Sequence, residues 1–168
     1  MSETHEKSST REQIVEHSGI MVDEEGNWTY QGNPIIREDI IRLFYEHLRF
    51  IPENGYVIEW EGAFHPVSVA DTPFVVTRVD ADENEQGVQS LWITLKHFPE
   101  RELLDPSTLF IGKNNVLYCK IHGGDFIARF SRPAYYQIAQ MIEEENGAFV
   151  IKVGGKTYEI REKPSFAS

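Results

Sequence analysis

Short apolar runs separated by turns rich in glycine, asparagine and proline cover most of the chain and predict many short β-strands. The clearest run ends at Leu95, where Leu91, Ile93 and Leu95 share one face of an extended segment. Further strands are expected within 20–36 and at 56–60, 64–69, 74–79, 88–95, 116–121, 126–130, 149–153 and 156–160.

Two segments show the helical period instead. Residues 37–49 carry apolar side chains at helical spacing, at Ile40, Ile41, Phe44 and Leu48, and Pro52 with Asn54-Gly55 would end the helix. The second helix follows Ser131, a typical N-cap residue, with Pro133 in its first turn. Its predicted buried stripe consists of Tyr135, Ile138, Ala139 and Ile142.

The order of these elements occurs twice, over residues 20–69 and again over 116–160. Pairing Gly55 with Gly147 also places Gly62 opposite Gly154. We therefore predict an α+β fold of two small lobes, each a hairpin–helix–hairpin unit with an antiparallel sheet packed on one helix. The pattern leaves open whether the halves arose by duplication. The predicted parts are a tail with a short N-terminal helix at 1–19, an N-terminal lobe at 20–95, a connector at 96–115 and a C-terminal lobe at 116–168.

The balance of charge narrows the choice of partners. The chain has 16 lysines and arginines against 27 aspartates and glutamates, for a net charge of −11. A negative field of this size repels phosphate backbones and anionic lipid surfaces. We expect neither nucleic acid nor a membrane as a partner.

The single cysteine and the polar N-terminus indicate a cytoplasmic protein. Cys119 lies in an apolar run, where a buried structural thiol is the expected role, and one cysteine cannot form an intrachain disulfide. The first residues lack the apolar stretch of a signal peptide, and no apolar run approaches the length that spans a bilayer.

The motifs that suggest catalysis all lack a required part. Gly154-Gly155-Lys156-Thr157 ends like a phosphate-binding loop, but valine stands at position 150, where the loop's first glycine is needed. His122-Gly123-Gly124-Asp125 is similar to an esterase oxyanion loop, but the chain has no GxSxG nucleophile motif. We therefore assign no catalytic residue and expect no cofactor, although enzymatic activity stays open.

The richest group of polar residues surrounds the turn at Gly62. Glu59, Glu61, His65 and Asp71 could form a carboxylate and imidazole metal site if the hairpin brings His65 back toward the glutamates. An exposed strand face with solvated charges is the simpler interpretation. The candidate ligand-binding residues are Trp60, Glu59, His65, Asp71 and Arg129.

The chain also resembles a bacterial family known as domain of unknown function 1285. The resemblance rests on order and spacing over residues 20–160, and its most regular feature is Asp71-Thr72-Pro73-Phe74. The other matching segments are Val22 to Trp28, Gly32 to Ile35, Leu43-Phe44, Leu117-Tyr118 to Arg129, Tyr135-Tyr136 and Gly154-Gly155. The resemblance implies a two-lobed fold with repeated motifs and a suggested role in signalling, and it supplies no catalytic residues.

We expect a non-enzymatic, regulatory binding module that recognises a small molecule or a protein near Trp60 and Asp71. A homo-oligomer stays open. The alternative is a metal-assisted hydrolase that uses Glu59, Glu61, His65 and Asp71.

Overall fold

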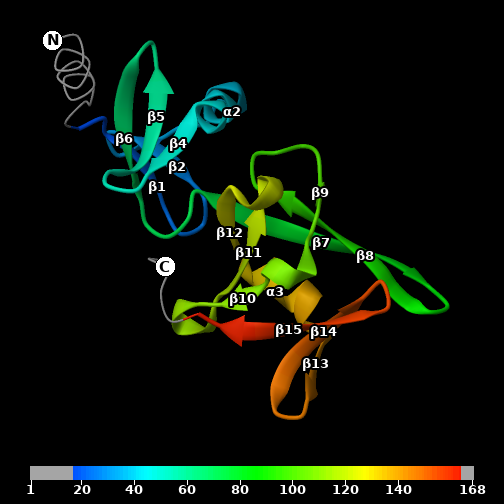
Figure 1. The fold of residues 1–168 in the computed structure, drawn as a ribbon. Coiled ribbons are helices and arrows are strands. Elements are labelled where there is room, and N and C mark those ends of the chain that lie inside the picture. The colour runs from blue at the N-terminus through cyan, green and yellow to red at the C-terminus, as the bar shows by residue number, and fades with distance from the viewer. Residues whose placement is uncertain (1–16, 164–168) are drawn as a thin grey trace, which may run out of the picture. The chain divides into compact units, whose positions relative to one another are not determined.

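The computed structural model describes residues 17–163, which form mostly β-strands together with two α-helices and two mixed sheets (Figure 1). The predicted α+β class is confirmed. The chain divides into two compact units between Pro73 and Phe74, which we call the first and the second unit. The predicted tail and most of the predicted N-terminal helix fall in residues 1–16, outside the described part. No helix within 17–163 has the length and apolar character needed to cross a membrane.

The first unit is a six-stranded sheet with one helix. Its strands follow the order β3-β2-β1-β6-β5-β4, in which β1 and β6 are parallel and the other neighbours are antiparallel. The elements are β1 (Ile20–Val22), β2 (Trp28–Tyr30), β3 (Asn33–Pro34), α2 (Glu38–Glu46), β4 (Leu48–Ile51), β5 (Gly55–Trp60) and β6 (Ala63–Val69).

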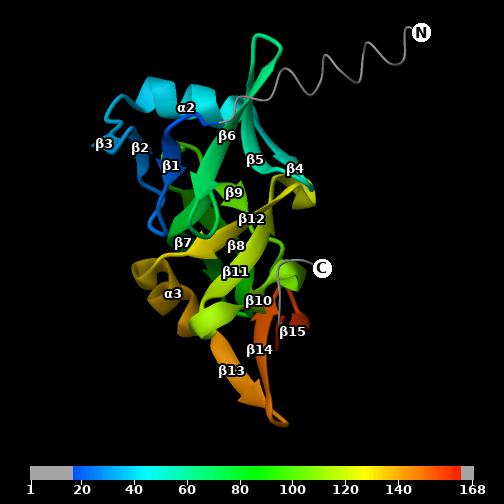
Figure 2. The ribbon, with the colours of Figure 1, turned by 90° about the vertical axis from the view of Figure 1, so that its left-hand side faces the viewer.

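Helix α2 is shorter than the predicted helix at 37–49. It ends at Glu46, and Leu48–Ile51 forms strand β4 because these residues pair antiparallel with β5. The helix lies over the strands (Figure 2), and its buried residues are Ile41 and Tyr45. The predicted stripe correctly included Ile41 but extended past the point where strand pairing begins.

The core beneath α2 is built on Trp28. Its side chain is 2% exposed, and its ring meets the Tyr45 ring edge-on at 5.1 Å. The indole N–H donates a hydrogen bond to the Tyr45 hydroxyl at 3.1 Å, and that hydroxyl donates to the Pro73 carbonyl. A buried indole N–H requires such a partner. Tyr45 thus fixes the helix, the sheet and the last residue of the first unit to one another.

The second unit is a nine-stranded sheet in the order β13-β14-β15-β10-β11-β12-β7-β8-β9. Two of its pairs, β10–β15 and β12–β7, are parallel. The elements are β7 (Phe74–Asn84), β8 (Gly87–Leu95), β9 (Glu102–Leu103), η1 (Pro106–Thr108), β10 (Phe110–Ile111), η2 (Lys113–Asn115), β11 (Leu117–Ile121), η3 (His122–Gly124), β12 (Phe126–Phe130), α3 (Arg132–Ala139), β13 (Ile142–Glu145), β14 (Ala148–Val153) and β15 (Lys156–Glu162).

The unit boundary differs from the predicted lobes. Phe74–Leu95 was expected in the N-terminal lobe, but β7 pairs in parallel with β12 and so belongs to the second sheet. The predicted connector at 96–115 contains β9, at one edge of that sheet, and β10, which lies between β15 and β11. Helix α3 begins as predicted, because the Ser131 hydroxyl accepts the N–H of Ala134 at 3.3 Å.

Six strands of the second unit reproduce the order of the first. The run β12-β11-β10-β15-β14-β13 matches β3-β2-β1-β6-β5-β4, and each helix follows three strands and precedes three others. The matching two-residue turns are Glu61-Gly62 and Gly154-Gly155, all with positive φ. Gly62 therefore corresponds to Gly155, one residue beyond the glycine that the sequence pairing gave. The second unit adds β7, β8 and β9 beside β12.

Replacing Tyr45 by phenylalanine should destabilise the protein by about 1–3 kcal/mol, because it leaves the buried Trp28 N–H and the Pro73 carbonyl without this partner. Urea unfolding at equilibrium measures the loss. The control is Tyr30→Phe, which removes a hydroxyl from a side chain that is 49% exposed and should cost less than about 0.5 kcal/mol. Equal losses in the two variants would contradict the proposed role of Tyr45.

Cys119 should resist alkylation in the folded protein. The thiol lies on β11 with no exposed surface, and burial raises its pKa, with the nearby charge of Glu102 acting in the same direction. Only the thiolate reacts, so iodoacetamide at about pH 8, near the ~8.5 pKa of a free thiol, should label Cys119 only after unfolding in guanidinium chloride. Rapid labelling of the native protein, followed by mass spectrometry, would contradict this expectation.

Candidate functional site

The first unit contains an apolar pocket of about 330 Å³ between α2 and the sheet. Its lining residues are Ile20, Leu43, Phe44, His47, Ile58, Trp60 and His65. The pairing of β5 with β6 sets Ile58 opposite His65, and Trp60 lies two residues further along the same strand face. The pocket therefore follows directly from the register of this hairpin.

An aromatic pair forms one wall of this pocket. His47, which caps the C-terminus of α2, meets the Trp60 ring edge-on at 4.9 Å. Trp60 is 42% exposed, so the wall is open to solvent. Apart from His47 and His65 the lining residues are aliphatic or aromatic, so the side-chain hydrogen-bonding groups of the pocket are the two imidazoles and the Trp60 indole N–H.

The structure brings together two of the five predicted ligand-binding residues, Trp60 and His65. Glu59 lies on the opposite face of β5, opposite Phe64, and forms an ion pair with Arg49 at 3.5 Å. Asp71 follows β6 and lies outside the lining of the pocket, and Arg129 belongs to β12 in the second unit.

Asp71 instead acts on Tyr56. Burial raises the pKa of the Tyr56 hydroxyl, and the negative charge of Asp71 raises it further. This places the two residues close enough for a charge effect within the first unit. Asp71 thus belongs to the surroundings of Tyr56 on β5 rather than to the pocket beside Trp60.

The four residues of the predicted metal site are not assembled around one point. Glu61 occupies the β5–β6 turn with a positive φ of 48°, and Glu59 and His65 lie on opposite faces of the hairpin. Across residues 17–163, no group of three or more histidine, cysteine, aspartate or glutamate side chains could hold a metal ion.

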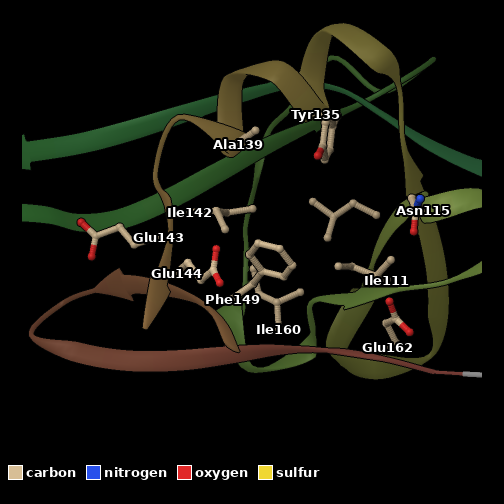
Figure 3. A pocket seen from close by; sticks show the side chains of 11 residues that line it. Ile111, Asn115, Tyr135, Ala139, Ile142, Glu143, Glu144, Phe149, Ile160 and Glu162 are labelled. Carbon is tan, nitrogen blue, oxygen red and sulfur yellow. The ribbon is translucent and has the colours of Figure 1, made fainter. Parts of the chain in front are cut away.

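A larger pocket of about 530 Å³ lies in the second unit between α3 and the sheet (Figure 3). Ile111, Ile142, Phe149 and Ile160 gather in it, and the Tyr135 ring points into it from the helix. The sequence did not indicate this site because Ile142 was assigned to the buried stripe of the second helix, whereas α3 ends at Ala139 and Ile142–Glu145 forms β13. Residues 142–145 read Ile-Glu-Glu-Glu and carry no apolar–polar alternation, so no local pattern indicated this strand.

Charge is divided between the two faces of β13. Glu143 and Glu145 both bind Lys152 on β14, at 3.3 and 2.9 Å, and these contacts raise the pKa of the Lys152 ammonium. Glu144 points to the other face, beside Phe149 in the pocket. The pocket therefore has a carboxylate at this end that Lys152 does not neutralise.

Comparison with known proteins gives two informative matches. The structure of a DUF1285 family protein from Silicibacter pomeroyi DSS-3 superposes with a TM-score of 0.71 at 21% identity, covering 88% of this chain and 81% of that one. A DUF1285 family protein from Shewanella baltica OS155 gives 0.59 at 18% identity, with coverages of 75% and 94%. The chain has the DUF1285 fold. No family model and no curated protein matches the sequence.

The shared DUF1285 fold supports the resemblance read from the sequence. At these identities the likeness establishes architecture alone, and it transfers no activity or ligand.

Proposed function

We propose that this protein is a non-enzymatic binding module whose first unit takes up a small apolar molecule in the pocket beside Trp60. The observation that carries the proposal is the composition of the lining, in which five aliphatic or aromatic side chains surround two histidines. Small-molecule sites commonly combine apolar walls with a few convergent polar groups, and their volumes start near 300 Å³. The pocket matches that description at its lower limit of size.

The geometry favours a flat ligand that rests on Trp60 and presents a hydrogen-bonding group to an imidazole. Trp60 is 42% exposed, and the His47 ring lies nearly perpendicular to it at 4.9 Å. His65 projects from the neighbouring strand into the same space. A regulatory role in the cytoplasm would suit a module that binds such a ligand and releases it unchanged.

We also infer that the chain is a member of the DUF1285 family and that its two units derive from one ancestral unit. The family resemblance over residues 20–160 and the shared fold support the first inference. The matching order of six strands and the matching turns support the second.

Trp60→Ala should weaken ligand binding in the first unit by roughly three- to tenfold, which corresponds to an aromatic contact of about 0.5–1.5 kcal/mol. The test titrates the protein with indole and with octanoate while ¹H–¹⁵N NMR follows backbone signals of α2 and β5. A saturable shift around His47 and Ile58 is expected with at least one of the two probes.

The matched control for this experiment is Phe50→Ala. Phe50 is 55% exposed on neighbouring β4 and contacts the Tyr56 ring, outside the lining of the pocket. Its removal should leave the titration unchanged. The proposal fails if neither probe gives saturable shifts in the first unit, or if the Trp60 and Phe50 variants behave alike.

A further inference from the structure

The pocket of the second unit occupies space that two large side chains fill in the first. Strand register establishes the first correspondence. In the first unit, Val22 on β1 aligns with Val69 on β6 and pairs on its other side with Trp28 on β2. In the second unit, Ile111 on β10 aligns with Glu162 on β15 and pairs on its other side with Leu117 on β11. Leu117 therefore stands where the first unit has its buried tryptophan.

The helices give the second correspondence. Arg37 and Ser131 are the N-cap residues of α2 and α3, and Leu48 and Ile142 begin the strands that follow the helices. Counting from either end places Ala139 at the position of Tyr45. The hydrogen-bonded pair Trp28–Tyr45 is thus replaced by leucine and alanine, and both replacements line the pocket.

Helix α3 is held so that it does not close over this space. Its fully buried residues are Ala134 and Ile138, and Gln137 accepts a hydrogen bond from the Val79 N–H of β7 at 2.8 Å. In α2 the buried residues are instead Ile41 and Tyr45, the counterparts of Tyr135 and Ala139. The buried positions of α3 are therefore displaced by one residue, roughly 100° around the helix, from those of α2, and Tyr135 and Ala139 line the pocket.

The charged residues that line this apolar space are all acidic. Three of the eleven lining residues are glutamates and none is basic, and Lys152 pairs with one of the three, Glu143. Glu144 lies beside Phe149 at one end and Glu162 beside Ile111 at the other (Figure 3). The net charge of −11 adds a long-range field of the same sign.

We propose that the second-unit pocket binds a small aromatic amine in its protonated form. The ring would take the space of the missing Trp28 and Tyr45 side chains, over Leu117 and beside Ala139, and the ammonium group would reach Glu144 or Glu162. This site is separate from the pocket proposed in the first unit and takes a ligand of different chemistry.

The test compares three probes that share an indole ring but differ in charge: tryptamine, 3-methylindole and indole-3-acetate. Near pH 7 the amine is protonated and the acid is ionised. Isothermal titration calorimetry should show saturable tryptamine binding, about tenfold weaker binding of 3-methylindole, and no detectable binding of indole-3-acetate at this site. Absence of saturable tryptamine binding, or equal binding of the acid, overturns the proposal.

Two sets of variants locate the site. The double change Leu117→Trp and Ala139→Tyr restores the side chains of the first unit and should reduce tryptamine affinity by more than about tenfold in a protein whose fold circular dichroism confirms. Glu144→Gln with Glu162→Gln should reduce the preference for tryptamine over 3-methylindole. If the Leu117→Trp and Ala139→Tyr variant does not fold, the two glutamine substitutions alone test whether tryptamine binds in this pocket.

The control for the charge effect is Glu159→Gln on β15, whose side chain lies on the opposite sheet face and pairs with Arg161 at 3.2 Å. It removes one carboxylate from the same region and should leave tryptamine binding unchanged. In the Trp60→Ala variant, in which the first-unit pocket is weakened, saturable tryptamine binding should remain, and this separates the two sites. Retained affinity in a folded Leu117→Trp and Ala139→Tyr variant would contradict the proposal.

Discussion

A parallel pair at the centre of the six-stranded arrangement that both units share determines most of the architecture. Strands β1 and β6, and likewise β10 and β15, join two groups of antiparallel strands into one six-stranded arrangement. A parallel pair cannot be closed by a tight turn, so the chain between its two strands must contain a crossover. In both units that crossover includes the helix, which then packs on one face of the sheet and defines the space in which a pocket can form.

What fills that space differs between the units. In the first unit Trp28 and Tyr45 occupy it and satisfy each other's polar groups, so the remaining pocket lies further along β5, beside Trp60. In the second unit Leu117 and Ala139 leave the equivalent region open. An interior normally closes over a void because unfilled space costs packing energy. Here β7 provides α3 with a different partner, and the hollow persists.

The sequence was informative wherever structure depends on neighbours along the chain. The Ser131 cap, the glycine turns and most strands follow from local chemistry, and they appear as expected. Strands β4 and β13 were missed because each directly follows a helix and becomes extended only through pairing with the next strand. The assignment of Phe74–Leu95 to the second unit depends on pairing with Phe126–Phe130, far along the chain, which no local pattern reveals.

In the candidate sites, too, the features set by neighbouring residues could be predicted and those set by distant residues could not. The Glu61-Gly62 turn has two residues, so Trp60 must pair with Ala63 and Ile58 with His65. This register puts Glu59 on the other face, and strand parity alone could have excluded it from a site with His65. The second-unit pocket could not be inferred in this way. It depends on the contact of α3 with β7, and on Leu117 and Ala139 being smaller than Trp28 and Tyr45 at the matching positions of the first unit. One scaffold can therefore present different chemistry from the same face, through the residues at two positions and the strand beside the helix.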